Sequence, residues 1–377
     1  MGRSYLDHAA STPVLPAARR AFLRALRVPG NPSSPHTEGR EAKELLEGAR
    51  RAIAKLAGMK REQVVFTGSA TEANNLAIAG HVAASLRKHV LYMDGAHASI
   101  VETAQSLAGE AIPLKEGALD MVALRRMIRP DTTLVSVEAV SSETGLRVDT
   151  RAVREVLDEV HAAGGPRIYL HVDASQLPLI ESFERTRLGA DLITLDAQKV
   201  GGVRGIGTLL ITPLVPLASV IQGGGQERGL RSGTPSPALA AAFAAALEQG
   251  APRRSGFQKR AEKLRALVCE EIKKIPNCIL NEGRDQAAHI INFSLIGRDT
   301  DYLATLLDAD GIAVSTKSAC ETDAEAGSRA VFALTGDAVR TQSTIRVSFG
   351  PTTAEGEVRR FLKALQARVA FLDHASL

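Results

Sequence analysis

The sequence has little of what disulfide-stabilised, metal-binding or membrane proteins need. Only 3 of its 377 residues are cysteines, too few and too scattered for a disulfide framework. No CxxC or HExxH pattern occurs, so we expect no metal site. No apolar run approaches the roughly 20 residues that span a bilayer, and residues 1–7 lack the apolar core of a signal peptide. We therefore expect a cytoplasmic protein with no membrane partner.

Aromatic residues and net charge are also low. Aromatics make up 4% of the chain and the formal net charge is +4, with no dense basic block. Stacking platforms for single-stranded nucleic acid need more aromatic residues than this, so we expect no nucleic-acid partner. The composition, 45% hydrophobic and 23% charged, is that of an ordinary folded protein.

Short β-branched runs alternate with longer segments of helical spacing, which predicts an α/β fold with a mainly parallel sheet flanked by helices. Strands are expected at residues 63–67, 89–92, 133–138, 167–172, 191–195 and 208–211. A polar, basic patch at 250–256 follows an alanine-rich helix and suggests a domain boundary. We expect a large cofactor-binding domain of residues 14–250 and a smaller α/β domain of residues 1–13 and 251–377.

Small residues follow the strand at 63–67, in the segment Gly68-Ser69-Ala70-Thr71-Glu72. Free backbone N–H groups at the start of the next helix could bind a phosphate, with hydroxyls from Ser69 and Thr71 as further donors. The same residues also fit an ordinary helix cap, with Ser69 as the capping residue and Glu72 three positions later. The residues alone leave both interpretations open.

Asp173 and Lys199 follow two expected strands, where ligands sit in open α/β sheets. A lysine amine can condense with an aldehyde, and a carboxylate can keep a pyridine nitrogen protonated, so the pair suits a Schiff-base cofactor. A solvated loop lysine and a helix-capping aspartate are the alternatives. Cys320, in a polar loop beside Lys317, could be a reactive thiolate or a buried, inert thiol.

Taken together, these motifs resemble the cysteine desulfurases (NifS-like), in the class V aminotransferase group of fold-type I pyridoxal-phosphate enzymes. The resemblance rests on segments that occur in the family's order along nearly the whole chain: Tyr5–Pro13, Asn31–His36, Ala70–Glu72, His171–Ala174, Gly223–Thr234, Ser318–Cys320 and Ile345–Ser348.

The resemblance implies a pyridoxal 5'-phosphate cofactor and a role for each matching residue. Lys199 would hold the cofactor as a Schiff base and later carry the Cα proton, while His97 would stack on the ring and assist proton transfer. The remaining cofactor contacts would come from Asp173 at the pyridine nitrogen, Gln176 at the ring hydroxyl, Ala70, Thr71 and Gln198 at the phosphate, and Thr234 at the phosphate of the partner in a homodimer.

The resemblance also implies a reaction. Arg346 would bind the carboxylate of L-cysteine, and Cys320 would take its sulfur as a persulfide, leaving L-alanine. The persulfide would then pass to a sulfur acceptor or an iron–sulfur scaffold protein, for iron–sulfur cluster assembly or thio-modification.

The sequence departs from the family around the lysine and in one substrate-binding loop. Asp196 and Gln198 stand where the family usually has a serine and a histidine, both of which help to hold the phosphate. An ionised Asp196 would repel a phosphate unless it points away, is protonated, or is offset by a cation such as Arg204. Ser141 and Ser142 replace paired asparagines, so direct contact of Ser142 with the substrate carboxylate is in doubt.

These departures keep two other functions open. The protein could be another pyridoxal-phosphate enzyme, such as a selenocysteine lyase, a different β-lyase or an aminotransferase. It could also be a degenerate, non-catalytic homologue that binds a scaffold partner.

Overall fold

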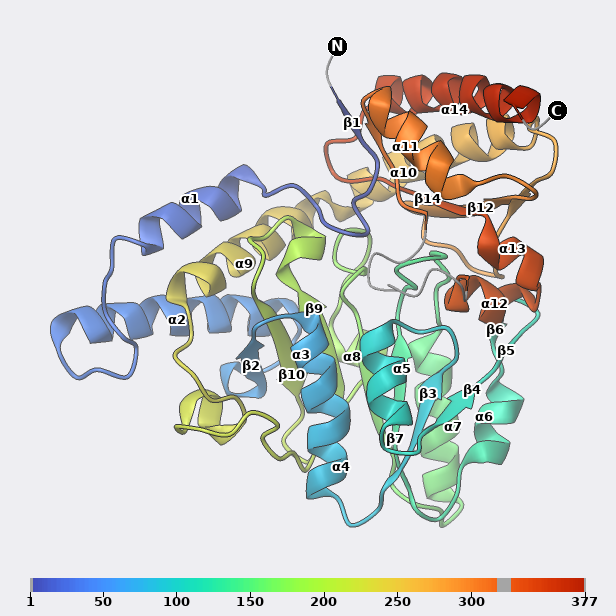
Figure 1. Cartoon of the computed structure of the whole chain (residues 1–377). Helices are drawn as coiled ribbons and strands as arrows, with labels where there is room; N and C mark the ends of the chain where they lie inside the picture. Colours follow the sequence, from blue (N-terminus) through green and yellow to red (C-terminus); the bar gives the residue numbers. More distant parts are fainter. Residues whose placement is uncertain (1–2, 317–326, 376–377) are drawn as a thin grey trace.

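A computed structural model describes residues 3–316 and 327–375 of the chain. Figure 1 shows a large sheet with helices on both faces and a smaller helix-covered sheet above it. Both described ends of the chain, near β1 (Ser4–Tyr5) and α14 (Glu355–Ala375), lie beside the smaller sheet.

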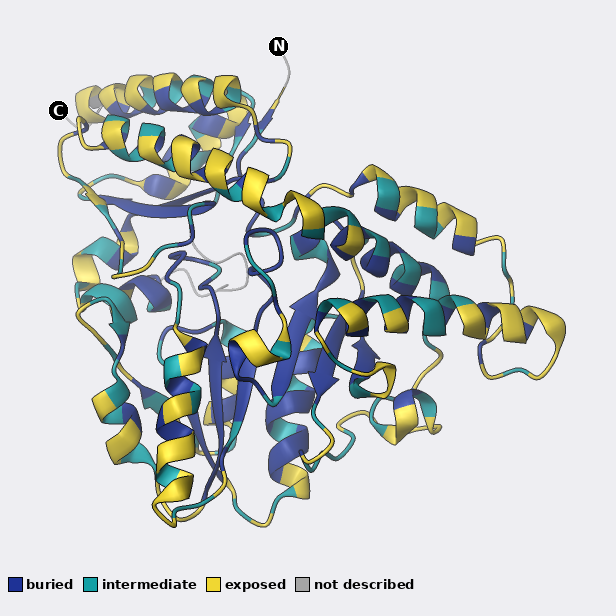
Figure 2. Cartoon of the chain, turned by 180° about the vertical axis from the view of Figure 1, so that it is seen from behind, coloured by how far each residue is buried: buried dark blue, intermediate teal, exposed yellow. Residues whose placement is uncertain are grey.

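The large sheet has 7 strands in the order β2-β10-β9-β8-β7-β3-β4. Their bounds are β2 Val64–Thr67, β3 His89–Met93, β4 Glu110–Ile112, β7 Thr132–Glu138, β8 Tyr169–Asp173, β9 Leu192–Asp196 and β10 Gly207–Ile211. The neighbours from β9 to β4 pair in parallel, whereas β10 is antiparallel to both β9 and β2. The central strands are buried along almost their whole length in Figure 2, as expected of a sheet covered on both faces.

Helices lie on both faces of this sheet. Figures 1 and 2 place α3 (Ala70–Asn75), α4 (His81–Ala84) and α5 (Ala98–Gln105) on one face and α7 (Thr150–Ala162) on the other. A π-helical segment, Leu76–Gly80, joins α3 directly to α4. The other helices of this part are α1 Pro16–Ala25, α2 Thr37–Leu56, α6 Met121–Met127, α8 Arg185–Leu188 and α9 Pro237–Gly250, and a hairpin is formed by β5 Leu114–Lys115 and β6 Ala118–Leu119.

The smaller sheet has 3 antiparallel strands in the order β11-β12-β14. The strands are β11 Cys278–Leu280, β12 Ile290–Leu295 and β14 Thr344–Ser348, and β1 pairs separately with β13 Ile312–Ala313. The helices of this part are α10 Arg254–Ile272, α11 Thr300–Ala309, α12 Arg329–Thr335, α13 Ala338–Gln342 and α14. The N-terminal strand thus pairs with a strand from the C-terminal third of the chain, and the domain division at residues 13 and 250 stays a prediction.

Candidate active site

The candidate residues follow four neighbouring strands at their carboxyl ends. His97 follows β3, Ser142 follows β7, Asp173 ends β8 and Lys199 follows β9. β3 and β7 are neighbours in the sheet. The strand that follows β3 in the chain, β4, lies on one side of this pair, and the strands that follow β7, namely β8 and β9, lie on the other side. Ligands of open α/β sheets bind in the crevice at such a switch point. The topology therefore gathers these four residues at one edge of the sheet.

Lys199 lies in a single 3-10 turn, Ala197–Val200, directly after β9. Gly201 ends that turn at φ 80°, and a Cβ on it would lie 2.5 Å from Leu15 Cγ, so glycine is required there. The Lys199 ammonium donates to the carbonyls of Ala9 (2.8 Å) and Ala10 (2.9 Å). The N-terminal segment thus holds the lysine in place.

Asp173 is held by hydrogen bonds to both carboxylate oxygens. Asn74 Nδ2 donates to Oδ2 at 2.8 Å, and the Ser175 backbone N–H donates to Oδ1 at 2.9 Å. Asn74 is fully buried in α3, and its Nδ2 also lies 2.8 Å from Ser99 Oγ. Asn74 has no local sequence signal of this role, because its partner Asp173 is 99 residues away along the chain.

His97 caps the start of α5 and belongs to the same network. The Ser99 backbone N–H donates to His97 Nδ1 at 3.1 Å, so the neutral ring carries its proton on Nε2. Burial lowers the pKa of His97, and the nearby Lys199 ammonium lowers it further, against the opposing effect of Asp173. A neutral imidazole with Nε2–H outward can stack on a flat ring or exchange a proton.

Gln176 lies just beyond Asp173 and is buried. Its Nε2 donates to the Ala9 carbonyl at 2.9 Å, the same oxygen that accepts from Lys199. Thr12 adds two further contacts, since its Oγ1 donates to the Lys199 carbonyl at 3.0 Å and its N–H donates to the Gln198 carbonyl at 2.8 Å. The signature around residues 5–13 therefore packs against the lysine turn.

The start of α3 has the helix cap that its sequence allowed, whereas phosphate binding there stays a prediction. Ser69 is the N-cap, and its Oγ accepts from the Glu72 N–H at 3.2 Å, so the capping prediction is confirmed. The neighbouring Ala70 N–H donates to Asp196 Oδ2 at 3.2 Å. Asp196 therefore points toward this turn rather than away from it, and its other oxygen accepts from the Gln198 N–H at 2.9 Å.

Thr71 and His97 line a hollow of about 420 Å³ between α3 and α5. Thr71 is exposed and Gln198 is half-buried, with its backbone in the lysine turn. Thr234 is also exposed, in the segment that begins with Gly223. A larger hollow of about 740 Å³ lies between α2 and residues 225–235 and includes none of the predicted site residues.

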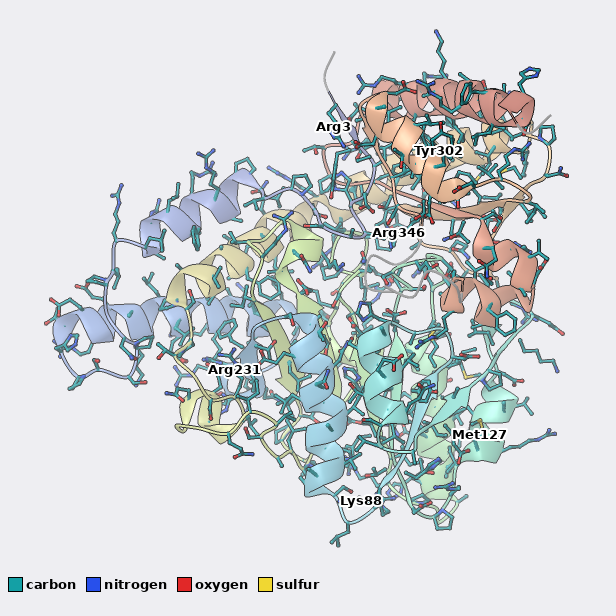
Figure 3. All side chains as sticks on the ribbon, viewed as in Figure 1. Arg3, Lys88, Met127, Arg231, Tyr302 and Arg346 are labelled. Carbon is teal, nitrogen blue, oxygen red and sulfur yellow. The ribbon has the colours of Figure 1, made fainter. Side chains whose placement is uncertain are left out.

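Arg346 projects from β14 into the junction between the two sheets (Figure 3). The guanidinium is buried, with Nη2 at 2.9 Å from Asp7 Oδ1 and Nη1 donating to the Ser142 carbonyl at 3.1 Å. Its Nε has no hydrogen-bond partner among the described residues. The structure therefore brings Arg346 and Ser142 together, and leaves one buried donor of the guanidinium unused.

Cys320 lies outside the described residues. Its flanks are described: the Ser315 N–H donates to the Arg346 carbonyl at 3.1 Å, and Ser328 Oγ hydrogen-bonds Glu143 Oε1. Cys269 and Cys278 are half-buried free thiols, and burial raises the pKa of Cys278 to about 12, so it is protonated and unreactive at neutral pH.

Comparison with known proteins places the chain in a family. The Aminotransferase class-V family matches residues 4–361. The IscS-like cysteine desulfurase of Mycobacterium tuberculosis is 33% identical, over 99% of this chain and 98% of its own length. Cysteine desulfurase IscS 1 of Archaeoglobus fulgidus is 33% identical, over 96% of this chain and 95% of its own length.

A solved structure described as a NifS-like protein matches with a TM-score of 0.90 and 27% identity, over 98% of this chain and 100% of that one. This match confirms the predicted α/β fold with its mainly parallel sheet. The chain therefore belongs to the class V aminotransferase family, and cysteine desulfurases are among its relatives.

Proposed function

We propose that the protein is a pyridoxal 5'-phosphate-dependent cysteine desulfurase that converts L-cysteine to L-alanine and receives the sulfur on Cys320. The observation that carries the proposal is the placement of Lys199, Asp173 and His97 at the carboxyl ends of β9, β8 and β3, where they interact electrostatically, in a chain of this family. The 33% identity to cysteine desulfurases along almost the whole chain supports the choice of substrate.

The residues at the ring end of the site fit the cofactor. Lys199 would hold it covalently through its amine, Asp173 would contact the pyridine nitrogen, and His97 would cover one face of the ring. Asp173 is suited to this, because Asn74 and Ser175 fix its orientation from behind. Gln176 would turn its amide from the Ala9 carbonyl to the ring hydroxyl.

When bound, the cofactor supplies an electron sink that stabilises negative charge at the substrate Cα. The chain supplies the proton handling: the Lys199 amine takes the Cα proton, and His97 Nε2 exchanges a proton with the reacting group. Both residues are partly or largely withdrawn from water, which strengthens their interactions with charge that develops during the reaction.

The sulfur step needs no external oxidant or reductant. The Cys320 thiolate attacks the substrate sulfur, an S–S bond forms as the Cβ–S bond breaks, and the electron pair stays on the carbon side. A proton then completes the methyl group of alanine, so the substrate carbon is reduced while the sulfur is oxidised to the persulfide level. The products are L-alanine and a persulfide on Cys320.

Substrate binding is assigned to Arg346, whose unpartnered Nε is a buried donor suited to a carboxylate. Ser142 is shorter than the asparagine expected there, and its carbonyl already accepts from Arg346. This difference favours one second candidate: a related lyase or aminotransferase with another substrate, such as a selenocysteine lyase. A panel of amino acids analysed for products distinguishes the two.

We further propose a homodimer in the cytoplasm that passes its persulfide to a sulfur acceptor or iron–sulfur scaffold protein, with no resident metal. Within the described residues, no helix is long and apolar enough to cross a membrane. The exposed Thr234 segment supports a second subunit, because its counterpart in the family contacts the neighbouring site.

The proposal is tested by the visible absorption spectrum of the purified protein before and after adding L-cysteine. We expect a yellow protein whose band changes with cysteine, with release of alanine and with pyridoxyl mass on the Lys199 peptide after borohydride reduction. Cys320→Ala should keep the colour and lose sulfur release, whereas the control Cys278→Ala should retain both. Full sulfur release by Cys320→Ala, or a protein that stays colourless with added cofactor, would refute the proposal.

A further inference from the structure

Asp196 is a buried carboxylate at the place where the proposed cofactor's phosphate would bind. It ends β9, it is 5% exposed, and its Oδ2 accepts from the Ala70 N–H at 3.2 Å. Backbone N–H groups at the start of a helical segment are the groups that bind phosphate oxygens. The chain's own carboxylate therefore uses one of the donors that the resemblance assigns to the cofactor.

The backbone around this carboxylate is tightly packed. Gly207 of β10 is the register partner of Asp196. A Cβ on Gly207 would lie 2.5 Å from the Ser69 carbonyl carbon and 2.8 Å from the Ala70 nitrogen, closer than real Cβ atoms come. β10 therefore lies directly against the turn, and the second Asp196 oxygen is tied to the Gln198 N–H. The carboxyl cannot move far from an arriving phosphate.

We propose that Asp196 takes up a proton when the phosphate binds and then donates an O–H···O hydrogen bond to it, so that cofactor loading weakens as pH rises. This inference rests on the proposed function, because it assumes that the phosphate binds at Ala70. The step is a proton transfer from solvent: the bond to hydrogen in a hydronium ion or buffer acid breaks as one O–H bond forms on Asp196.

The charges around Asp196 are consistent with this coupling. The ionisable groups that interact with Asp196 are Lys199 of the 3-10 turn, Asp173 of β8 and His97 before α5; Glu72 of α3, the helix whose first N–H Asp196 accepts from, is paired with Arg231. Burial already raises the pKa of Asp196, Asp173 raises it too, and the N–H donors and Lys199 lower it. A phosphate dianion adds a further like charge, which raises this pKa again.

The affinity for the phosphate depends on pH in three ranges. Below the pKa of Asp196 in the free protein, both states hold the proton and affinity is highest. Between that pKa and the higher pKa of the complex, binding takes up a proton, and affinity falls by up to about tenfold per pH unit. Above both values the affinity is low and constant.

The experiment measures binding of pyridoxamine 5'-phosphate, which has the phosphate but no aldehyde and so cannot react with Lys199. Calorimetry in two buffers of different ionisation enthalpy gives both the dissociation constant and the protons taken up. Across a pH series from about 5 to about 9, the wild type should lose more affinity than Asp196→Asn, by up to about tenfold per pH unit where Asp196 titrates, and it should take up more protons on binding. Titrations of the ligand itself are common to both proteins and cancel in the comparison.

Asp191→Asn is the matched control, because Asp191 precedes the opposite end of β9 and burial also raises its pKa. It should keep the wild-type pH dependence. If Asp196→Asn does not fold, Asp196→Ser makes the same comparison. Equal pH dependence and equal proton uptake in the wild type and the Asp196 variants would overturn the inference while leaving the proposed function intact. Failure of all the proteins to bind at every pH would overturn both.

Discussion

Glu138 is a second buried carboxyl beside the site, and no motif in the sequence points to it. It ends β7 as the register partner of Asp173 and is 3% exposed. Burial raises its pKa well above the ordinary value, and the neighbouring Asp173 raises it further, against a hydrogen bond from the His97 backbone N–H. We therefore expect Glu138 to be protonated at neutral pH, which avoids two adjacent buried carboxylates.

This protonation predicts a pH-dependent effect of Glu138→Gln on stability. A raised pKa in the folded state means that unfolding releases a proton above pH ~4.3, the ordinary value for glutamate, so stability falls as pH rises toward the folded-state pKa. The glutamine amide does not titrate. The free energy of unfolding of Glu138→Gln should therefore rise relative to that of the wild type by up to about 1.4 kcal/mol per pH unit in this window. Urea unfolding at about pH 5 and about pH 8 measures the difference.

The control for this prediction is Glu159→Gln, because the Glu159 side chain is 62% exposed. The difference in free energy of unfolding between Glu159→Gln and the wild type should stay the same at the two pH values. A Glu138→Gln protein whose stability follows the wild type at both pH values would mean that Glu138 is ionised in the folded protein.

Residues of the site differ in how far the sequence could identify them. Lys199 and Asp173 were found because each follows a strand, and strand ends can be predicted from hydrophobic patterning. Asn74 was missed because a polar residue inside a helix carries no local signal of a partner on a distant strand. The orientation of Asp196 depends on Gly207 lying against α3, a tertiary contact that no local pattern specifies.

At the scale of elements, the segment from Gly223 to Thr234 is anchored by a buried ion pair. Glu227 accepts from Arg50 of α2 through both oxygens, at 2.7 Å each, and from the Phe66 N–H of β2 at 2.8 Å. Glu227 and Arg228 have positive φ angles of 46° and 59°, which these contacts must offset. The glycine-rich motif therefore has a structural basis beside its proposed role at the cofactor.

This anchor predicts a large cost for Glu227→Gln. Removing this charge leaves the buried Arg50 with only Glu47 as an ionic partner, and breaking a buried ion pair typically costs up to about 3–5 kcal/mol. Chemical denaturation measures the loss, and limited proteolysis should cut the 223–234 segment faster. Glu47→Gln is the control, because Glu47 contacts the same Arg50 at 3.0 Å but is 25% exposed, and it should cost less than about 1 kcal/mol. Equal losses in the two variants would contradict the anchor.

The order of strands and helices was largely predictable, because buried strands and amphipathic helices have different hydrophobic periods. The predicted strand at 208–211 corresponds to β10, but its antiparallel direction was not specified. The connection from Asp196 to Gly207 is shorter than the dozen or more residues that a parallel crossover needs, so its length was the available signal. α1 carries a weak sequence signal, because among its 10 residues the one leucine, Leu23, is exposed and the buried positions are two alanines, Ala18 and Ala25.

At the scale of the whole molecule, the proposed homodimer predicts that each active site uses residues of two chains. Lys199 and the exposed Thr234 would act on the same cofactor only across the subunit interface. Lys199→Ala and Thr234→Val homodimers should each lose activity. A mixed dimer contains one site with both defects and one site with neither, so it should recover about half of the wild-type activity.

Differently tagged chains, co-expressed and purified through both tags, provide the mixed dimer. Alanine formation from L-cysteine and pyridoxyl labelling of Lys199 report on the restored site. If Thr234 acted within its own chain, the only chain with Lys199 would lack its threonine, and the mixed dimer would show no recovery beyond the average of the two homodimers. The same preparation tests the Glu227 ion pair. Adding Glu227→Gln to the Lys199→Ala chain should displace the Thr234 of that chain. Because that Thr234 serves the site with the intact Lys199 of the other chain, the recovered activity should fall.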